Sequence, residues 1–483
     1  MQTTHTFDQF PLSPEIQRAV EELGFKSCTP IQFETLTALL KEPSDFLGLA
    51  ATGTGKTAAF GIPLLERIDP KIKGIQGIIL CPTRELAQQV SKQILALAKY
   101  KKIKMATIYG GAGYSEQIRD LKVCSIVIAT PGRLIDHLER RNLSLKQIHT
   151  VILDEADEMI SMGFRDDLEL ILKQTESDNR LTWLFSATLN ADLRQVASRY
   201  LEKPKTVTLN QKEEASKNIE QLYFIVEERN KPKLLCRLLD AEEDFYGLIF
   251  CQTKIRVDEI YQTLKQKHYP VECLHGDKSQ KERERSMQAF RDGKARIMVS
   301  TDVAARGLDV NKLSVVVNYS IPMDPEIYTH RIGRTGRIGN KGKSISFFAP
   351  QEEHLFRAIE RQSRVPLKKG EIPSAKEIFK KQTETFLEDF LAVDKSEKVL
   401  SWLPIEWEKI AETFSPQEII ARFLSLRFSK LILENQNSKE QILEENFWPA
   451  RRGSSSNNRR GGFSRSGGGF SRGNTRSYGP RRR

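Results

Sequence analysis

One segment near the N-terminus, Gly48 to Pro63, carries residues that could bind a nucleotide phosphate: GLAATGTGKTAAFGIP. Gly55, Lys56 and Thr57 fit the phosphate-cradling pattern of a glycine, four residues and Gly-Lys-Ser/Thr, whereas Ala50 stands where that pattern has its first glycine. Glycines let backbone N–H groups turn toward phosphates at a helix N-terminus. Lys56 would reach the β- and γ-phosphates, and Thr57 would hold Mg²⁺. A Gly/Thr turn opening an ordinary helix is the alternative.

A second motif, which is acidic, favours the phosphate-binding loop over the ordinary turn. The apolar run Thr150 to Leu153 leads directly into Asp154-Glu155, about one hundred residues after the loop. A Walker-type ATPase needs this arrangement: Asp154 would hold Mg²⁺, largely through water, and Glu155 would position and deprotonate the attacking water. The motif therefore favours a nucleotide hydrolase over a solvated acidic turn.

Such a hydrolase also needs positive charge beside the γ-phosphate in the transition state. The segment HRIGRTGR, His330 to Arg337, supplies it through Arg334 and Arg337. We expect these arginines at a spacing of three on a helix, with glycines that permit close approach. A basic surface helix is the alternative.

These residues need elements that position them, and eight short apolar runs provide candidates. Continuous runs rich in Ile and Val are typical of strands buried on both faces of a parallel sheet. Helical patterns between them imply right-handed crossovers, so we predict two doubly wound α/β domains in series. The runs are Gly77–Leu80, Ser125–Ala129, Thr150–Leu153, Thr182–Phe185, Gly247–Phe250, Arg296–Ser300, Ser314–Asn318 and Ser344–Phe348.

Polar clusters follow these runs directly, where ligands bind in open parallel sheets. We expect the active edges of both sheets to face one cleft. The clusters are CPTRELA after the first run, TPGR, DEAD and SAT after the next three, and CQTK and TDVAARGLD in the second half.

Length and composition limit the number of domains, the distribution of charge and the cellular setting that we expect. The chain has 483 residues, enough for roughly three domains. The formal net charge is +12, but residues 451–483 hold ten arginines and no acid or lysine, so 12 − 10 leaves +2 for the rest. We find no export signal and no membrane-spanning run. Six scattered cysteines without a CxxC pair argue against zinc or a disulfide framework and favour a reducing, cytoplasmic setting.

Taken together, the motifs make this chain similar to the DEAD-box RNA helicases of superfamily two. That family's phosphate loop reads AxxGxGKT, which Ala50, Gly53, Gly55, Lys56 and Thr57 match. The resemblance covers roughly residues 7–350 and implies two RecA-like domains. The implied ATP-binding residues include a Q motif that reads adenine and a ribose contact; they are Phe7, Phe25, Gln32, Ala50, Ala51, Thr52, Gly53, Thr54, Gly55, Lys56, Thr57 and Asp309.

The resemblance also implies residues for catalysis, coupling and RNA binding. Lys56, Asp154, Glu155, Arg334 and Arg337 are the implied catalytic set. Coupling of hydrolysis to unwinding falls to Asp157, Ser186, Thr188 and His330. The RNA contacts implied in the two domains are Pro82, Thr83, Arg84, Gly110, Gly111, Thr130, Pro131, Arg133, Gly276 and Thr301.

The implied mechanism is ATP- and RNA-driven domain closure that bends one strand and opens a short duplex. RNA phosphates and 2′-hydroxyls would be contacted, so sequence preference should be weak. The chain most resembles the bacterial branch associated with cold shock and RNA decay, with ribosomal precursors or decay machinery as partners. An ATP-gated RNA clamp, or an annealing chaperone driven mainly by the tail, is the alternative function.

We divide the chain accordingly. Residues 1–209 form the first RecA-like domain, 210–218 the linker and 219–365 the second domain. A helical extension, 366–449, carries Phe386, Leu387, Phe390 and Leu391 on one apolar face and Ile419, Ile420, Phe423, Leu424, Phe428, Leu431 and Ile432 on another. It is a candidate homodimerisation module, with a helical cap on the second domain as the alternative.

Beyond it, residues 450–483 cannot bury enough apolar surface to fold. The tail interleaves arginines, among them Arg451, Arg452, Arg459 and Arg460, with Phe463, Phe470 and Tyr478. That composition suits sequence-tolerant RNA binding, and a solubilising tail is the alternative.

Overall fold

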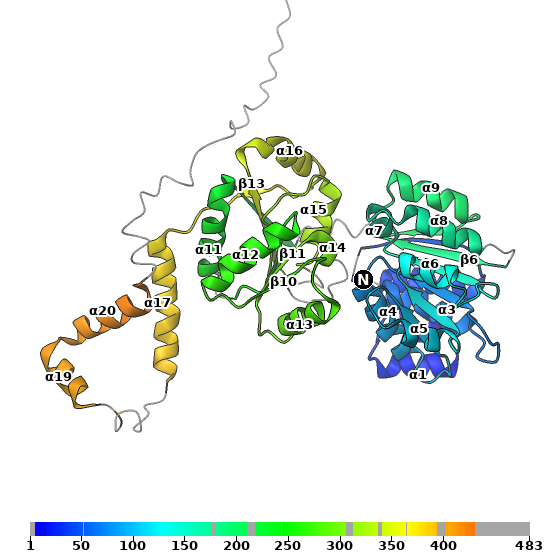
Figure 1. Cartoon of the computed structure of the whole chain (residues 1–483), viewed down its shortest axis with the longest axis horizontal. Helices are drawn as coiled ribbons and strands as arrows, with labels where there is room; N and C mark the ends of the chain where they lie inside the picture. Colours follow the sequence, from blue (N-terminus) through cyan, green and yellow to red (C-terminus); the bar gives the residue numbers. More distant parts are fainter. Residues whose placement is uncertain are drawn as a thin grey trace, which may run out of the picture. The chain divides into compact units, whose positions relative to one another are not determined.

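The computed structural model describes residues 5–51, 53–175, 179–209, 218–242, 244–305, 313–336, 341–363, 365–393, 402 and 404–429. Several residues singled out above lie outside these ranges, namely Thr52, Asp309, Arg337, Leu431, Ile432, nearly all of the expected linker and the whole arginine-rich tail. Two seven-stranded sheets organise the described chain (Figure 1). We call residues 5–209 the N-terminal lobe and residues 218–369 the C-terminal lobe.

The N-terminal lobe is built on a fully parallel sheet in the order β3-β4-β2-β5-β6-β1-β7. All four strands that the apolar runs predict in this half are present, within one residue at either end. The strands are β1 (Phe46–Leu49), β2 (Gly77–Leu80), β3 (Met105–Ile108), β4 (Ile126–Ala129), β5 (Thr150–Asp154), β6 (Leu181–Ser186) and β7 (Lys205–Thr208).

Helices cover both faces of this sheet and enclose two hydrophobic cores. One core gathers Phe46, Phe60 and Phe185, and the other gathers Leu47, Leu153 and Leu184, as expected when successive strand residues point to opposite faces. The helical elements are η1 (Phe7–Gln9), α1 (Pro14–Glu22), α2 (Pro30–Lys41), α3 (Lys56–Arg67), α4 (Arg84–Leu97), α5 (Tyr114–Leu121), α6 (Pro131–Glu139), α7 (Ala156–Ser161), α8 (Arg165–Gln174) and α9 (Ala191–Tyr200).

The C-terminal lobe repeats the same topology in the order β10-β11-β9-β12-β13-β8-β14. Its four predicted strands are also confirmed. The strands are β8 (Ile219–Ile225), β9 (Gly247–Phe250), β10 (Val271–Leu274), β11 (Ile297–Ser300), β12 (Val315–Asn318), β13 (Gly342–Phe348) and β14 (Lys368–Lys369). The helical elements are η2 (Glu228–Asn230), α11 (Lys231–Ala241), α12 (Lys254–Gln266), α13 (Gln280–Arg291), α14 (Asp302–Ala305), α15 (Pro325–Ile332), η3 (Pro350–Glu352) and α16 (Glu353–Gln362).

The C-terminal extension contains helices α17 (Ala375–Ala392), α19 (Ile405–Thr413) and α20 (Pro416–Arg427). Helix α17 lies against α11, where Lys381 donates to the Ala241 carbonyl and Gln382 to that of Asp240. The rings of Phe379 and Phe386 contact Phe428. Much of the predicted apolar surface is nevertheless uncovered: Phe390 is 66% exposed and Phe423 is 53% exposed. Among the described helices, none is both long and apolar enough to cross a bilayer.

Candidate nucleotide and RNA site

The phosphate loop connects β1 to the first turn of α3. Gly53 and Gly55 have φ angles of +83° and +92°, a left-handed conformation that glycine adopts without steric cost. At Gly55 a Cβ would lie 2.5 Å from Nε2 of Gln32, so the position also requires the absence of a side chain. Lys56 Nζ donates to the Ala50 carbonyl at 3.1 Å, and Thr54 Oγ1 donates to that of Ala51 at 2.8 Å. The loop is thus curled around its own lysine.

Gln32 lies beside this loop with hydrogen-bonding capacity to spare. Its Oε1 accepts from Thr29 N–H at 2.9 Å, which completes the capping box of α2, and its Nε2 donates to the Gly55 carbonyl at 3.2 Å. A primary amide has two N–H donors and two acceptor lone pairs, so one of each remains. That is the donor and acceptor pair an adenine edge needs. Nearby, Phe7 is buried and its ring centroid lies 6.0 Å from that of the exposed Phe25.

Asp154 and Glu155 are both buried where β5 ends and α7 begins. Burial raises the pKa of Asp154 to about 7; the Lys56 ammonium opposes that rise, and the Glu155 carboxylate adds to it. Within the described chain, Asp154 Oδ1 and Glu155 Oε2 are buried without a hydrogen-bond partner. Buried carboxylate oxygens without donors, next to a lysine and a phosphate loop, fit a hydrated Mg²⁺ ion, which binds through one or two carboxylates, several waters and substrate phosphates.

The backbone of Glu155 is itself unusual, because its φ of +53° lies in the left-handed region that side chains disfavour by about 1–2 kcal/mol. The N–H groups of Glu158 and Met159 donate to the Glu155 carbonyl and maintain this turn. Strained backbone of this kind is concentrated at functional sites.

Asp157, Ser186 and Thr188 form one buried hydrogen-bond network. Oδ2 of Asp157 accepts from the backbone N–H of Thr188 at 2.9 Å and from its hydroxyl at 2.8 Å. The Ser186 hydroxyl donates to the Thr188 carbonyl at 2.6 Å. The segment that follows β6 is therefore fixed to the segment that follows β5, so a shift of one must move the other.

The C-terminal lobe contributes His330, whose Nδ1 lies 2.6 Å from Glu158 Oε1. Burial lowers the pKa of His330, but the carboxylates of Glu158 and Asp157 raise it more, and the net pKa is above the ordinary value. Arg334 is buried in the same hollow, which is lined by His330, Arg331, Arg334, Glu158, Asp302, Phe250, Ala305 and Ile327.

The expected placement of Arg334 on a helix is wrong, and Arg337 lies outside the described residues. Helix α15 ends at Ile332, and Arg334 lies beyond its C-cap residue Gly333 in a turn. The physical reason is a contact with a distant segment: the Thr335 hydroxyl donates to the Leu313 carbonyl at 2.5 Å, and Gly336 turns the chain with φ of +67°. The position of Arg334 is therefore set by this turn and not by the periodicity of helix α15.

Three predicted RNA-binding motifs meet in the N-terminal lobe. The Arg84 guanidinium lies against Gly110 and Gly111, so close that a Cβ at Gly111 would be 2.4 Å from its Nη1. Arg133 donates to the Ala112 carbonyl at 3.1 Å and to Gln117 at 3.2 Å. Thr83 caps α4, Pro82 precedes it, and Thr130 N–H donates to the Ile108 carbonyl just ahead of Pro131. Chain segments far apart in sequence therefore form one guanidinium-bearing surface.

In the C-terminal lobe, Gly276 and Thr301 follow neighbouring strands β10 and β11. Thr301 N–H donates to the Leu274 carbonyl at 3.4 Å, and no atom lies within 4 Å of where a Gly276 Cβ would be. This open glycine beside a threonine leaves backbone groups accessible to a ligand.

Sequence reasoning missed several residues at these edges. Arg283 donates to Glu85 Oε1 at 2.6 and 3.0 Å, linking the two lobes, and Arg84 Nη1 lies 3.5 Å from Gln280 Oε1. Arg331 is buried and binds both oxygens of Asp302 at 2.6 and 2.8 Å. Glu85, Asp302 and Arg331 all lie inside motifs that the sequence singled out, but each arginine is on a segment distant from its acidic partner, so no local pattern pairs them.

A phosphate loop, a strand-end acidic pair and an arginine on a second sheet of identical topology define a two-lobed RecA-like nucleotide hydrolase. Residues 29–196 match the DEAD/DEAH box helicase family model, and residues 230–339 match the helicase conserved C-terminal domain. The chain belongs to the DEAD-box ATP-dependent RNA helicases.

Curated relatives and a solved structure agree with this assignment. The chain is 43% identical to DEAD-box ATP-dependent RNA helicase CshA of Bacillus subtilis over 80% of its own length and 78% of that protein. It is 40% identical to CshA of Geobacillus kaustophilus over 91% of its own length and 93% of that protein. The structure of S. cerevisiae Dbp5 bound to RNA and ADP BeF3 superposes with a TM-score of 0.71 at 31% identity, covering 78% of this chain and 99% of that one.

Proposed function

We propose that this helicase locally opens short RNA duplexes and uses hydrolysis at the β1–β5 edge to release the RNA. One observation carries the assignment of the site. The Lys56 ammonium acts electrostatically on the Asp154 carboxyl, and Asp154 and Glu155 each keep a buried oxygen without a donor in the described chain. A phosphate chain with its cation would satisfy all three groups at once.

In the proposed ATP complex, Lys56 leaves the Ala50 carbonyl and pairs with the β- and γ-phosphates. The free N–H and lone pair of Gln32 face adenine, while Phe7 and Phe25 support the base. The loop N–H groups from Ala50 to Thr57, Thr52 among them, surround the phosphates, and Asp309 meets the ribose. Thr57 and Asp154, largely through water, would hold Mg²⁺, which when bound neutralises charge on the phosphates.

Glu155 then orients and deprotonates the attacking water, and Arg334 with Arg337 stabilises the charge that develops on the transferred phosphoryl group. The Asp157–Thr188 hydrogen bonds transmit the change at β5 to the segment after β6, and His330 joins the C-terminal lobe to the same motif through Glu158. Asp157, Ser186, Thr188 and His330 form the proposed coupling set.

RNA would bind along the guanidinium-bearing surface of the N-terminal lobe and beside Gly276 of the C-terminal lobe. Pro82, Thr83, Arg84, Gly110, Gly111, Thr130, Pro131 and Arg133 contribute from the first, and Gly276 and Thr301 from the second. Arginine side chains and backbone N–H groups suit phosphates, which predicts weak sequence preference.

We also propose the division into domains at 1–209, 219–365, 366–449 and 450–483, with 210–218 as the linker.

The exposed aromatic side chains of α17 and α20 support a homodimer through the extension. The tail, with Arg451, Arg452, Arg459 and Arg460, would tether RNA. We further propose a cytoplasmic role in cold adaptation, ribosome assembly or RNA decay, as the resemblance to the bacterial branch described above implies.

ATP hydrolysis with and without single-stranded RNA, beside a DNA control, tests the proposal. We expect stimulation by RNA, loss of turnover in Glu155→Gln and weaker RNA affinity in a chain ending at Ala450. Equal stimulation by DNA would contradict the RNA contacts. If Lys56→Ala still anneals strands and the truncation does not, the annealing chaperone replaces the helicase as the main activity. ATP-dependent RNA retention without strand separation would indicate a clamp.

A further inference from the structure

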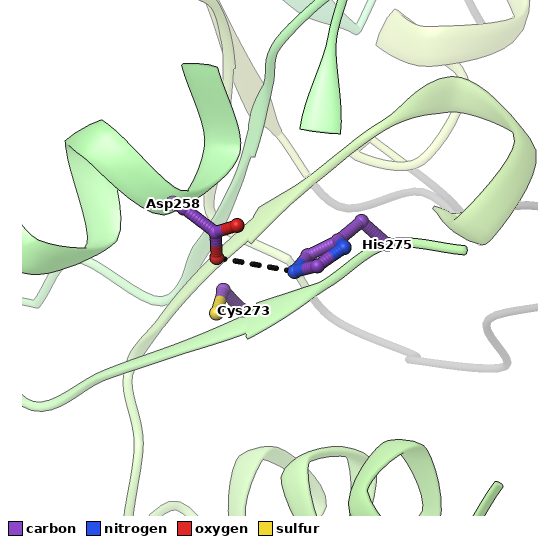
Figure 2. A group of neighbouring side chains, drawn as sticks. All are labelled: Asp258, Cys273 and His275. Carbon is purple, nitrogen blue, oxygen red and sulfur yellow. Dashed lines mark hydrogen bonds and ion pairs between the residues drawn. The ribbon is translucent and has the colours of Figure 1, made fainter. Parts of the chain in front are cut away.

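A cluster of three different metal-ligating side chains lies in the C-terminal lobe, apart from the residues assigned above (Figure 2). Asp258 projects from α12, Cys273 from the end of β10, and His275 directly follows that strand. His275 Nε2 lies 3.1 Å from Asp258 Oδ1, and one ligand atom from each residue lies within 4.8 Å of the other two.

Although the spacing of the cysteines argued against zinc, we propose that Asp258, Cys273 and His275 form a binding site for a divalent transition metal ion of the zinc class. A thiolate, an imidazole and a carboxylate are the ligand types that zinc uses, whereas Mg²⁺ and Ca²⁺ take oxygen ligands. Zinc bonds of about 2.0–2.3 Å in a tetrahedron place ligand atoms roughly 3.3–3.7 Å apart. Rotation of exposed Asp258 and small shifts of the other two side chains bring the cluster to that geometry.

The state of His275 supports a ligand at its Nε2. The side chain is 5% exposed, and within the described chain its Nδ1 has no hydrogen-bond partner. No acceptor therefore fixes the ring proton on Nδ1, and Nε2 lies against the Asp258 carboxylate. A metal ion at Nε2 would take the tautomer whose single ring proton is on Nδ1, which is a neutral imidazole ligand.

Access to the site is provided by Asp258, whose side chain is 53% exposed, while Cys273 is buried at 1%. The ion would enter on the carboxylate side, where water could supply the fourth ligand of a three-residue site. Two features weaken the binding. The Lys278 ammonium interacts with the Cys273 sulfur and must move away, and His275 Nδ1 has no second-shell acceptor, an absence that reduces affinity about 10–100-fold. We therefore expect an exchangeable ion.

Titration of the full chain, without a histidine tag, with Co²⁺ tests the site directly. We expect one equivalent to give a thiolate-to-cobalt charge-transfer band that Zn²⁺ displaces. Cys273→Ser should abolish the band, and Asp258→Asn and His275→Gln should each weaken Zn²⁺ binding at least tenfold. The matched controls are Cys28→Ser, a half-buried thiol of the other lobe, and His268→Gln, an exposed histidine just before β10.

Three results would overturn the proposal: no charge-transfer band in the wild-type chain, a band that survives Cys273→Ser, or a band lost in Cys28→Ser. Because Cys273 is buried, circular dichroism confirms that its variant is folded. Asp258→Asn changes a solvated side chain, so unaltered Zn²⁺ affinity in that variant also counts against the site.

Discussion

The two lobes share one sheet topology, yet their first loops differ in chemistry. In each lobe the strand next to the sheet's last position, β1 or β8, leads through a short loop to a helix that begins with a buried lysine, Lys56 or Lys231. These lysines are 6% and 1% exposed. The folds therefore place equivalent ammonium groups at equivalent points.

The loops make the difference. The N-terminal loop has glycines at Gly53 and Gly55, whereas residues 226–230 read VEERN, with no glycine and two carboxylates. Glu228 pairs with Lys231, whose ammonium lies 5.9 Å from the Tyr319 ring centroid. The second lysine is thus neutralised by its own loop. The two lobes indicate that a RecA-like sheet alone does not make a nucleotide site: the loop must also turn donors inward and place no carboxylate of its own against the lysine.

The largest expected effect is a difference in ATP turnover between variants of Lys56 and variants of Lys231. Lys56→Ala should lower RNA-stimulated turnover at least ~100-fold, because it removes the positive charge that stabilises the transferred phosphoryl group. Lys231→Met should keep turnover within about threefold, since its partner Glu228 is 53% exposed and stays solvated. Steady-state ATPase assays at saturating RNA measure both. A comparable loss in Lys231→Met would place a second functional lysine in the C-terminal lobe.

The glycine requirement can be examined with Gly55→Ala. The substitution adds a Cβ that collides with Gln32 at a φ of +92°, so we expect the KM for ATP to rise about tenfold or more. Gly163 is the matched control, because its φ is +85° but nothing lies within 4 Å of its Cβ position. Gly163→Ala should lose about 1–2 kcal/mol of stability and leave the KM for ATP unchanged. Equal KM changes in both variants would show that backbone strain alone is responsible.

Asp157, a member of the proposed coupling set, accepts both bonds from Thr188. Asp157→Asn should lower the free energy of unfolding by about 1.5–3 kcal/mol and reduce the duplex opened per ATP hydrolysed. A double-mutant cycle with Thr188→Val isolates the hydroxyl bond. If the effects of Asp157→Asn and Thr188→Val on unwinding are additive, Thr188 does not belong to the coupling set.

The smallest effect concerns pH and the contact between the lobes. The pKa of His330 is raised in the fold by Glu158 and Asp157, against burial and the Arg334 charge. A raised histidine pKa stabilises the folded state below the unfolded value of about 6.5, and this contribution disappears as pH rises through the raised pKa. The stability difference between wild type and His330→Gln should therefore shrink from pH 6 to pH 8.5 in denaturant titrations. A difference that grows with pH would reverse the assigned sign.

The sequence by itself determined the buried centre of both sheets and the residues at their edges. Runs such as Gly77–Leu80 and Gly247–Phe250 are strands because continuous apolar residues suit burial on both faces. The sequence did not reveal β7, whose residues are half-buried or exposed, β8, where buried positions are interspersed with more exposed ones, or β1, which Gly48 interrupts. It also did not reveal β3, β10 or β14. The phosphate loop, DEAD and SAT motifs were recognisable because their chemistry is encoded over a few consecutive residues.

Only the tertiary structure decided how distant residues pair. Arg283 reaches Glu85, Arg331 binds Asp302, and Asp258 meets Cys273 and His275 across sequence gaps that no local pattern spans. It also moved Arg334 off the helix on which its spacing had placed it. The physical reason is that sequence periodicity reports which face of an element is buried, whereas a pairwise contact depends on how two elements are packed.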